Sequence, residues 1–70
     1  MQTSLSQFVT KQRKALGLTQ PELAAQSGLG LRFIREVEAG KPTLRLDKVN
    51  QLLAFWGHTL VPEPLPRHQP

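Results

Sequence analysis

Apolar side chains recur along the first part of the chain at intervals of about 3.6 residues, the period of an amphipathic α-helix. The first such set comprises Leu5, Phe8, Val9 and Leu16. Ser4 and Gln7 have the spacing of a capping box, in which two side chains satisfy free backbone amides at the start of a helix. Gly17 supplies the left-handed conformation that closes a helix. We therefore predict a first helix that begins near Ser4 and stops at Gly17.

Two shorter helices are predicted next, joined by a tight turn. Thr19 and Glu22 have the spacing of a second capping box, so one helix begins at Thr19 and ends after two turns at Gly28. The other extends over residues 30–39 and stops at Gly40. The residues expected to face inward are Leu23, Ala24, Ile34 and Val37, with Phe33 at the flank. A helix of two turns is marginal alone, so we expect its neighbours to hold it.

A wider apolar set follows Gly40 and predicts a fourth helix that ends near Gly57. Its members are Leu44, Leu46, Val49, Leu52, Leu53 and Trp56. The three short helices before it offer too little surface to bury the whole set, so we expect part of it to meet a second protomer. The sequence therefore predicts an all-α bundle of four to five short helices.

A short strand is predicted after the fourth helix. Residues 58–61 read His-Thr-Leu-Val between Gly57 and Pro62, and threonine and valine favour extended structure. A single strand is not stable on a helical monomer, so we expect this β-strand to pair with its copy in a dimer. The chain is thus divided into a helical domain over residues 1–57, a dimerisation strand over 58–62 and a disordered, proline-rich tail over 63–70.

Four residues of the second and third predicted helices have the spacing of a helix-turn-helix motif. They are Ala24, Gly28, Ile34 and Val37. Helices that cross steeply need a small residue at the contact, the turn needs a left-handed residue, and branched apolar residues lock the second helix onto the first. In such motifs the second helix enters the major groove of DNA. A plain helical hairpin with the same spacing is the alternative.

Composition and charge favour a nucleic-acid partner over catalysis. The 70 residues contain no cysteine, so disulfides and thiolate metal sites are excluded. The two histidines, His58 and His68, are too few for a structural zinc site without unusual carboxylate ligands. Dense helix packing, a dimer or both are therefore expected to support so small a core. The net charge is +4, of which residues 1–41 carry +3. No glycine-rich phosphate loop, nucleophile elbow or metal-ligand cluster occurs. We predict no enzyme, no metal and no cofactor.

The sequence also lacks the features of a membrane or exported protein. No apolar run is long enough to span a bilayer, and the N-terminus lacks the basic-then-apolar layout of a signal peptide. The absence of cysteine suits a reducing compartment. We therefore expect a cytoplasmic protein with no membrane partner.

The helix-turn-helix segment resembles the XRE/Cro/C1 family of repressors. The resemblance covers about residues 8–57 and is carried by Leu18, Thr19, Gln20, Glu22, Leu23, Ala24, Gly28, Ile34, Glu38 and Gly40. It implies a lambda-repressor-like bundle and a sequence-specific repressor of transcription that binds double-stranded DNA. It also implies a structural salt bridge between Arg13 and Glu38, and a phosphate contact from Gln20.

The fourth helix and the Thr59-Leu60-Val61 segment after it are similar to HipB-like antitoxins. That resemblance implies a homodimer with Trp56, Thr59, Leu60 and Val61 at its interface. It also implies repression of the protein's own operon and binding of a HipA-like kinase toxin. Two other functions stay open: a stand-alone phage-type or restriction-modification controller repressor, and a protein-interaction module on a helix-turn-helix scaffold.

The outward face of the third predicted helix carries the residues expected to contact bases. Arg32 is expected to pair bidentately with guanine O6 and N7, and Leu31 to contact a thymine methyl group. Arg35, one turn further on, reaches a base or a phosphate. Glu36 either accepts from cytosine N4 or pairs with Arg32, four residues earlier on the helix.

Contacts to the DNA backbone are expected from residues around the motif. Gln20 lies at the start of a helix, where free N–H groups and a partial positive charge favour a phosphate. Lys41 follows the recognition helix, Gly30 permits close approach of the backbone, and Lys11 adds positive charge. Such contacts set affinity and register without reading sequence. A twofold dimer is expected to place its two recognition helices about 34 Å apart on a palindromic operator.

Overall fold

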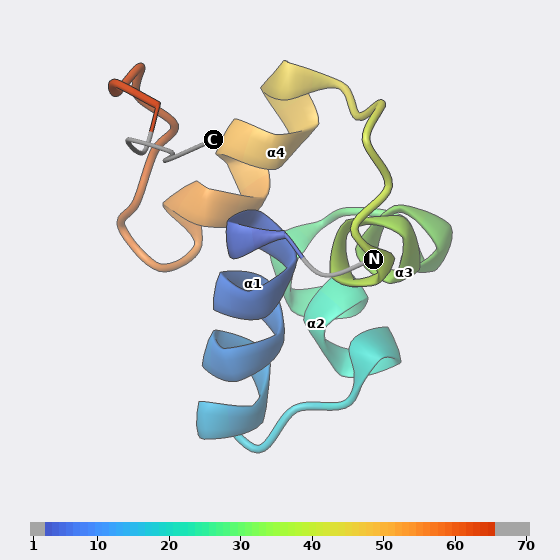
Figure 1. Cartoon of the computed structure of the whole chain (residues 1–70). Coiled ribbons are helices and arrows are strands. Elements are labelled where there is room, and N and C mark those ends of the chain that lie inside the picture. Colours follow the sequence, from blue (N-terminus) through green and yellow to red (C-terminus); the bar gives the residue numbers. More distant parts are fainter. Residues whose placement is uncertain (1–2, 66–70) are drawn as a thin grey trace.

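The computed structural model describes residues 3–65, which form short helices joined by turns (Figure 1). In chain order they are α1 (Ser4–Ala15), α2 (Gln20–Ser27), α3 (Leu31–Ala39) and α4 (Leu46–Ala54). The prediction of an all-helical bundle is confirmed for the described residues, which contain four helices and no strand. None of these helices is long and apolar enough to cross a membrane.

The capping box at the start of α1 lies one residue earlier than predicted. Thr3 Oγ1 accepts from the Ser6 amide at 3.0 Å, and Ser6 Oγ accepts from the Thr3 amide at 2.8 Å. Ser4 and Gln7 therefore do not form the box. The physical reason is that the short hydroxyl of Ser6, which is fully buried, reaches the Thr3 amide and does what we expected of a glutamine side chain.

The other end of α1 also differs from the prediction. The helix ends two residues before Gly17, which takes the left-handed conformation (φ +70°) in the turn. Leu16, predicted to face inward, is 54% exposed because it lies beyond the last helical turn. The inward face of α1 therefore rests on Val9, which is fully buried, with Leu5 and Phe8 packed against the core.

The ends of α2 and α3 confirm the local signals in the sequence. Thr19 Oγ1 accepts from the Glu22 amide at 3.2 Å, while the Glu22 carboxylate accepts from the Thr19 amide at 2.8 Å. This backbone hydrogen bond from Thr19 is the main reason why the pKa of Glu22 is lowered. Gly28 and Gly40 close the two helices with φ values of +77° and +79°.

The fourth helix is shorter than its apolar pattern indicates. α4 begins at Leu46 and is followed by a turn that leads to Gly57. Leu44, the first member of the apolar set, lies in the loop before the helix and packs, half-buried, against the core. Leu46 is 69% exposed. The loop residues that precede α4 thus belong partly to the core, whereas the first residue of the helix does not.

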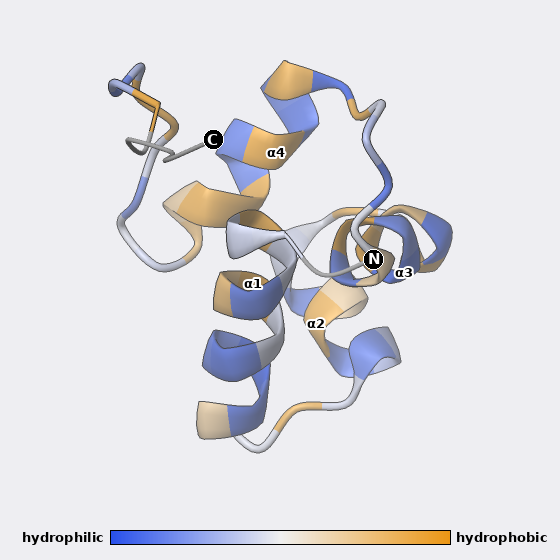
Figure 2. Cartoon of the chain, viewed as in Figure 1, coloured by the Kyte–Doolittle hydropathy of each residue, from blue (hydrophilic) through white to orange (hydrophobic). Residues whose placement is uncertain are grey.

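The core lies where α1 and α2 pack against α3, with α4 closing one side (Figure 1). Its fully buried members are Val9, Leu23, Ile34, Val37 and Leu52. Figure 2 shows polar and apolar residues alternating along the helices, so that each helix has an apolar side to turn inward. Burial of apolar area is the main force that fixes α3 on its inner side.

The segment after Gly57 is not a strand in the single chain. Residues 58–65 have no regular structure, because a strand needs a neighbouring strand and residues 3–65 offer none. Asn50 holds the segment against α4 instead, since its Oδ1 accepts from the Leu60 amide at 3.0 Å and from the Thr59 hydroxyl at 3.3 Å. Of the predicted disordered tail over 63–70, residues 66–70 lie outside the described residues.

Candidate nucleic-acid interface

The helix-turn-helix residues hold α3 in a fixed orientation on α2. Ala24 is buried, and both Ile34 and Val37 are fully buried. Gly28 has φ +77°, and a Cβ there would meet Gln51 Nε2 at an ordinary 3.8 Å, so the backbone conformation rather than lack of space requires glycine. The side of α3 opposite Ile34 and Val37 is thereby presented outward.

An almost buried ion pair fastens α3 to α1. Arg13 donates from Nε to Glu38 Oε2 at 2.7 Å and from Nη2 to Glu38 Oε1 at 3.0 Å, while its Nη1 donates to the Leu18 carbonyl at 2.8 Å. Burial by itself raises the pKa of Glu38, but hydrogen bonds from Arg13 and Gln20 outweigh it and lower that pKa below its ordinary value. The hydrogen bond to Glu38 is the main cause of the raised pKa of Arg13.

Gln20 joins the same network at the start of α2. Its Nε2 donates to Glu38 Oε1 at 3.1 Å, and the residue is half-buried. The side chain expected to contact a phosphate is therefore tied through one carboxylate to both α1 and α3. This arrangement keeps the N-terminus of α2 at a fixed position relative to the outward face of α3.

The outward face of α3 carries two exposed arginines, Arg32 and Arg35. The Arg32 side chain is 91% exposed, and its Nε donates to Glu36 Oε2 at 3.3 Å. Lys41, just beyond the helix, donates to the same oxygen at 3.2 Å. The hydrogen bond from Lys41 is the largest cause of the lowered pKa of Glu36. Arg35, by contrast, forms no ion pair within residues 3–65.

The other predicted DNA contacts are placed differently. Leu31 is half-buried and packs against the core, so only part of its side chain is left for the expected contact with a thymine methyl group. Gly30 caps the start of α3, and nothing lies within 4 Å of where its Cβ would be, so its backbone is open to approach. Lys11 is exposed on α1.

A hollow of about 390 Å³ opens beside α3. Its lining residues are Gly30, Arg32, Phe33, Glu36, Lys41, Thr43, Leu44, Arg45 and Lys48. Sequence reasoning missed Arg45 and Lys48, which reach this place because the loop after Gly40 and the first turn of α4 fold back beside α3. Charge could have found them, since they are the next basic residues after Lys41. Arg45 donates two hydrogen bonds, of 2.7 and 3.1 Å, to Asp47.

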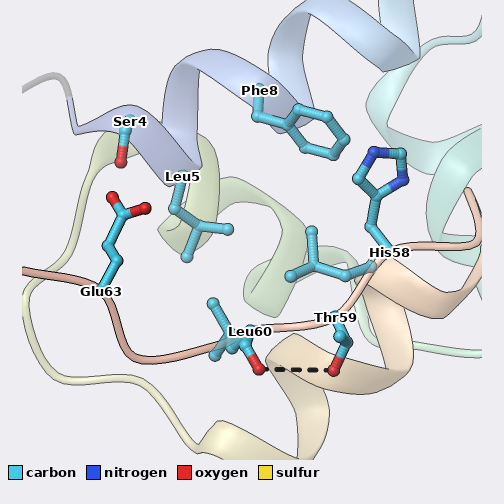
Figure 3. A pocket seen from close by; sticks show the side chains of 8 residues that line it. Ser4, Leu5, Phe8, His58, Thr59, Leu60 and Glu63 are labelled. Carbon is cyan, nitrogen blue, oxygen red and sulfur yellow. Dashed lines mark hydrogen bonds between the residues drawn. The ribbon is translucent and has the colours of Figure 1, made fainter.

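Two of the residues expected at a dimer interface, Thr59 and Leu60, line a second hollow of about 380 Å³ between α1 and the segment after α4 (Figure 3). Its lining residues are Ser4, Leu5, Phe8, Leu53, His58, Thr59, Leu60 and Glu63. Figure 3 shows Glu63 extending toward Ser4, at the start of α1. Val61, which follows Leu60 and is not among the lining residues, is 68% exposed. No group of three or more histidine, aspartate or glutamate residues in the described part of the chain is placed to hold a metal ion.

Trp56, also expected at the dimer interface, packs against aromatic rings of its own chain. It is half-buried, and its ring meets Phe8 of α1 edge to face, with centroids 6.0 Å apart. A second edge-to-face contact, at 5.3 Å, joins it to Phe55. Its Nε1 is buried and has no hydrogen-bond partner among residues 3–65. The ring therefore ties the end of α4 to α1.

Two comparisons with known proteins bear on this surface. A helix-turn-helix family model, HTH_3, matches residues 9–56, which include α2, the turn and α3. The uncharacterized HTH-type transcriptional regulator y4mF of Sinorhizobium fredii (strain NBRC 101917 / NGR234) is 53% identical over 45 residues, which are 64% of this chain and 59% of y4mF. The match thus spans less than two thirds of that relative's length. Both similarities point to a DNA-binding regulator rather than an enzyme.

Proposed function

The chain belongs to the XRE-type helix-turn-helix family, and on that premise we propose that it is a sequence-specific transcriptional repressor that binds operator DNA as a homodimer. The observation that carries the proposal is the outward face of α3. This face is basic and exposed, while the opposite side of the helix is fixed by the buried Ile34, Val37 and Glu38. A rigid helix with exposed arginines suits the major groove, where base edges differ from pair to pair.

The proposed base contacts come from α3. Arg32 donates to guanine O6 and N7, the exposed part of Leu31 meets a thymine methyl group, and Arg35 reaches a base or a phosphate. Glu36 lies between Arg32 and Lys41 and contributes through these cations rather than by accepting from cytosine.

The proposed backbone contacts surround these base contacts. Gln20 and Gly30 offer the starts of α2 and α3 to phosphates, and Lys41 adds charge beside α3. Lys11 gives charge from α1. Two residues join the set because of their place in the hollow beside α3: they are Arg45 and Lys48. Binding is therefore expected to weaken steeply as salt is added.

The proposed dimer forms through the segment after α4. Leu60 and Val61 are 39% and 68% exposed, although each is apolar. Pairing of this segment with its copy would supply the missing neighbouring strand and cover these side chains. The dimer would present two copies of α3 to successive turns of a palindromic site, about 34 Å apart.

The test of this function is DNA binding by Arg32→Ala. A duplex that the wild-type protein recovers from a randomised pool serves as the probe, and fluorescence anisotropy measures affinity. We expect the variant to lose about tenfold or more in affinity, with weaker selection of one G·C pair. Lys14→Ala removes one positive charge from the exposed end of α1 and is the matched control, expected to keep the same selectivity. An Arg32→Ala protein as selective as the wild type contradicts the proposal.

A second candidate function is that of a HipB-like antitoxin that represses its own operon and binds a HipA-like kinase toxin. The feature that favours it is the segment over residues 58–65, which has no regular structure in the single chain and leaves Val61 68% exposed for a partner. Co-expression with a kinase encoded beside the gene, followed by co-purification, tests it. A repressor that binds its operator fully, with no such kinase gene beside it, is a stand-alone regulator.

A further inference from the structure

One carboxylate, Glu36, joins two cations of the proposed DNA-binding face. Its Oε2 accepts from Arg32 Nε at 3.3 Å and from Lys41 Nζ at 3.2 Å. Arg32 and Glu36 are four residues apart on α3, where side chains lie on the same side of a helix. Exposed ion pairs of this kind contribute little to stability. The two ion pairs of Glu36 therefore matter mainly for how Arg32 and Lys41 meet DNA.

The geometry of the guanidinium group gives that explanation. Arginine carries five N–H donors in one plane, one on Nε and two on each Nη atom. Glu36 takes the Nε edge of Arg32, which leaves the edge formed by the two Nη groups to donate outward. Two donors on this edge match the two acceptors of guanine, O6 and N7. Lys41 holds the same carboxylate oxygen, so the carboxylate itself is kept in place.

The same arrangement reduces attraction to DNA of any sequence. Non-specific binding comes from positive charges that neutralise phosphates. Here the charges of Arg32 and Lys41 are partly balanced by Glu36, and that of Arg45 by Asp47. In contrast, Arg35 has no acidic partner within residues 3–65.

We propose that Glu36 is a positioning residue that sets the selectivity of the protein for guanine: it fixes the plane of the Arg32 guanidinium and lowers affinity for non-operator DNA. The inference rests on the proposed function, because it needs α3 in the major groove. Glu36 contacts no base in this role and acts through Arg32. Glu36 is therefore expected to change the ratio of the affinities for different duplexes rather than to raise every affinity equally.

The experiment compares the wild-type protein with Glu36→Gln, which keeps the shape of the side chain and removes its charge. The probes are the duplex recovered from a randomised pool, the same duplex with each G·C pair changed to A·T in turn, and a shuffled duplex. We expect Glu36→Gln to bind the shuffled duplex several-fold more tightly, with a steeper dependence on salt. We also expect discrimination at the pair contacted by Arg32 to fall about five- to tenfold.

Two further variants separate positioning from charge. Asp47→Asn removes a negative charge from a neighbour of Arg45 and touches neither Arg32 nor Lys41, so it is expected to raise affinity for all duplexes alike. In an Arg32→Ala background, Glu36→Gln is expected to leave discrimination unchanged, because the group that it positions is absent. A loss of discrimination that persists in this background overturns the inference.

The outcomes also distinguish the inference from the function on which it rests. A selective wild-type protein with an equally selective Glu36→Gln variant overturns the inference and leaves the repressor proposal intact. A wild-type protein that recovers no preferred duplex contradicts the proposed function, and the inference with it. Thermal unfolding followed by circular dichroism checks that each variant is folded.

Discussion

Two arginine–glutamate pairs place a carboxylate on α3, and they have opposite surroundings. Arg13 and Glu38 are 13% and 7% exposed, whereas Arg32 and Glu36 are 91% and 27% exposed. The first pair is bidentate and the second is joined through one N–H group. Glu36 and Glu38 are two residues apart, so they lie on different sides of the helix.

Burial, rather than residue type, separates the pair that stabilises the fold from the pair on the proposed DNA-binding face. Removing one partner of a buried pair leaves an unpaired charge with little access to water, which is costly. An exposed pair is screened by water and salt, so its loss costs little stability. One helix therefore carries an inward ion pair that stabilises the fold and an outward one that adds little to stability.

The largest expected effect comes from breaking the buried pair with Glu38→Ala. The substitution leaves the guanidinium of Arg13 without its carboxylate and removes the acceptor of Gln20. We expect the free energy of unfolding to fall by about 3 kcal/mol. Urea denaturation followed by circular dichroism measures it, at protein concentrations held equal between variants. A loss as small as that expected for an exposed pair would show that burial adds nothing to the contribution of this pair.

A smaller loss is expected from Arg13→Lys, which keeps the charge and removes the planar donor fork. Lysine reaches one oxygen of Glu38 but cannot also donate in parallel to the second oxygen and to the Leu18 carbonyl. The expected loss is about 1–2 kcal/mol in the same urea measurement. If the variant is as stable as the wild type, charge alone accounts for the pair and its geometry contributes nothing.

Acid is expected to remove part of the same stabilisation. The pKa of Glu38 is lower in the folded protein than its ordinary value of 4.5, so the contribution of the carboxylate is complete above 4.5 and is lost as the pH falls through the folded value. The midpoint of urea denaturation should therefore fall more below pH 4.5 in the wild type than in Glu38→Gln. Equal acid dependence in the two proteins would show that other carboxylates, such as Glu22, carry the effect.

The smallest effect on stability is expected from Glu36→Ala. The residue has two cationic partners, but Arg32 is almost fully exposed and both ion pairs lie in water and salt. We expect the urea midpoint to stay within the error of the wild-type measurement. A loss close to that of Glu38→Ala would show that the outward pair is structural too.

Much of the fold could be predicted because its signals are local. The pairing of Thr19 with Glu22 and the positions of Gly28 and Gly40 need only neighbouring residues, and the structure has all of them as predicted. The helix α1 begins at Ser4 as predicted, but its capping box lies one residue earlier, because Ser6 caps as a glutamine would and its burial is not visible in the sequence. Leu16 is predicted to face inward but is exposed, because the helix ends at Ala15 and does not continue through Leu16.

The candidate interface was predictable only in part, for a different reason. Arg32 and Glu36 share a side of α3 by spacing alone, but the contact of Lys41 with Glu36 depends on how the chain turns after Gly40. Arg45 reaches the hollow through the same turn and was missed. The strand over residues 58–62 depends on a second chain, which the described single chain does not contain, so its formation stays a prediction.

The side chain of Asn50 affects what drives the proposed assembly of two copies. Its Oδ1 already accepts a hydrogen bond from the Leu60 amide, so this N–H is not an unsatisfied donor in the separate chain. If two copies pair these segments, they exchange one acceptor for another, and the net gain in hydrogen bonding is small. The free energy of assembly would then come mainly from burial of the apolar side chains of Leu60 and Val61. Asn50 would compete with a second chain for the Leu60 amide, and so limit pairing of the exposed segment with other strands.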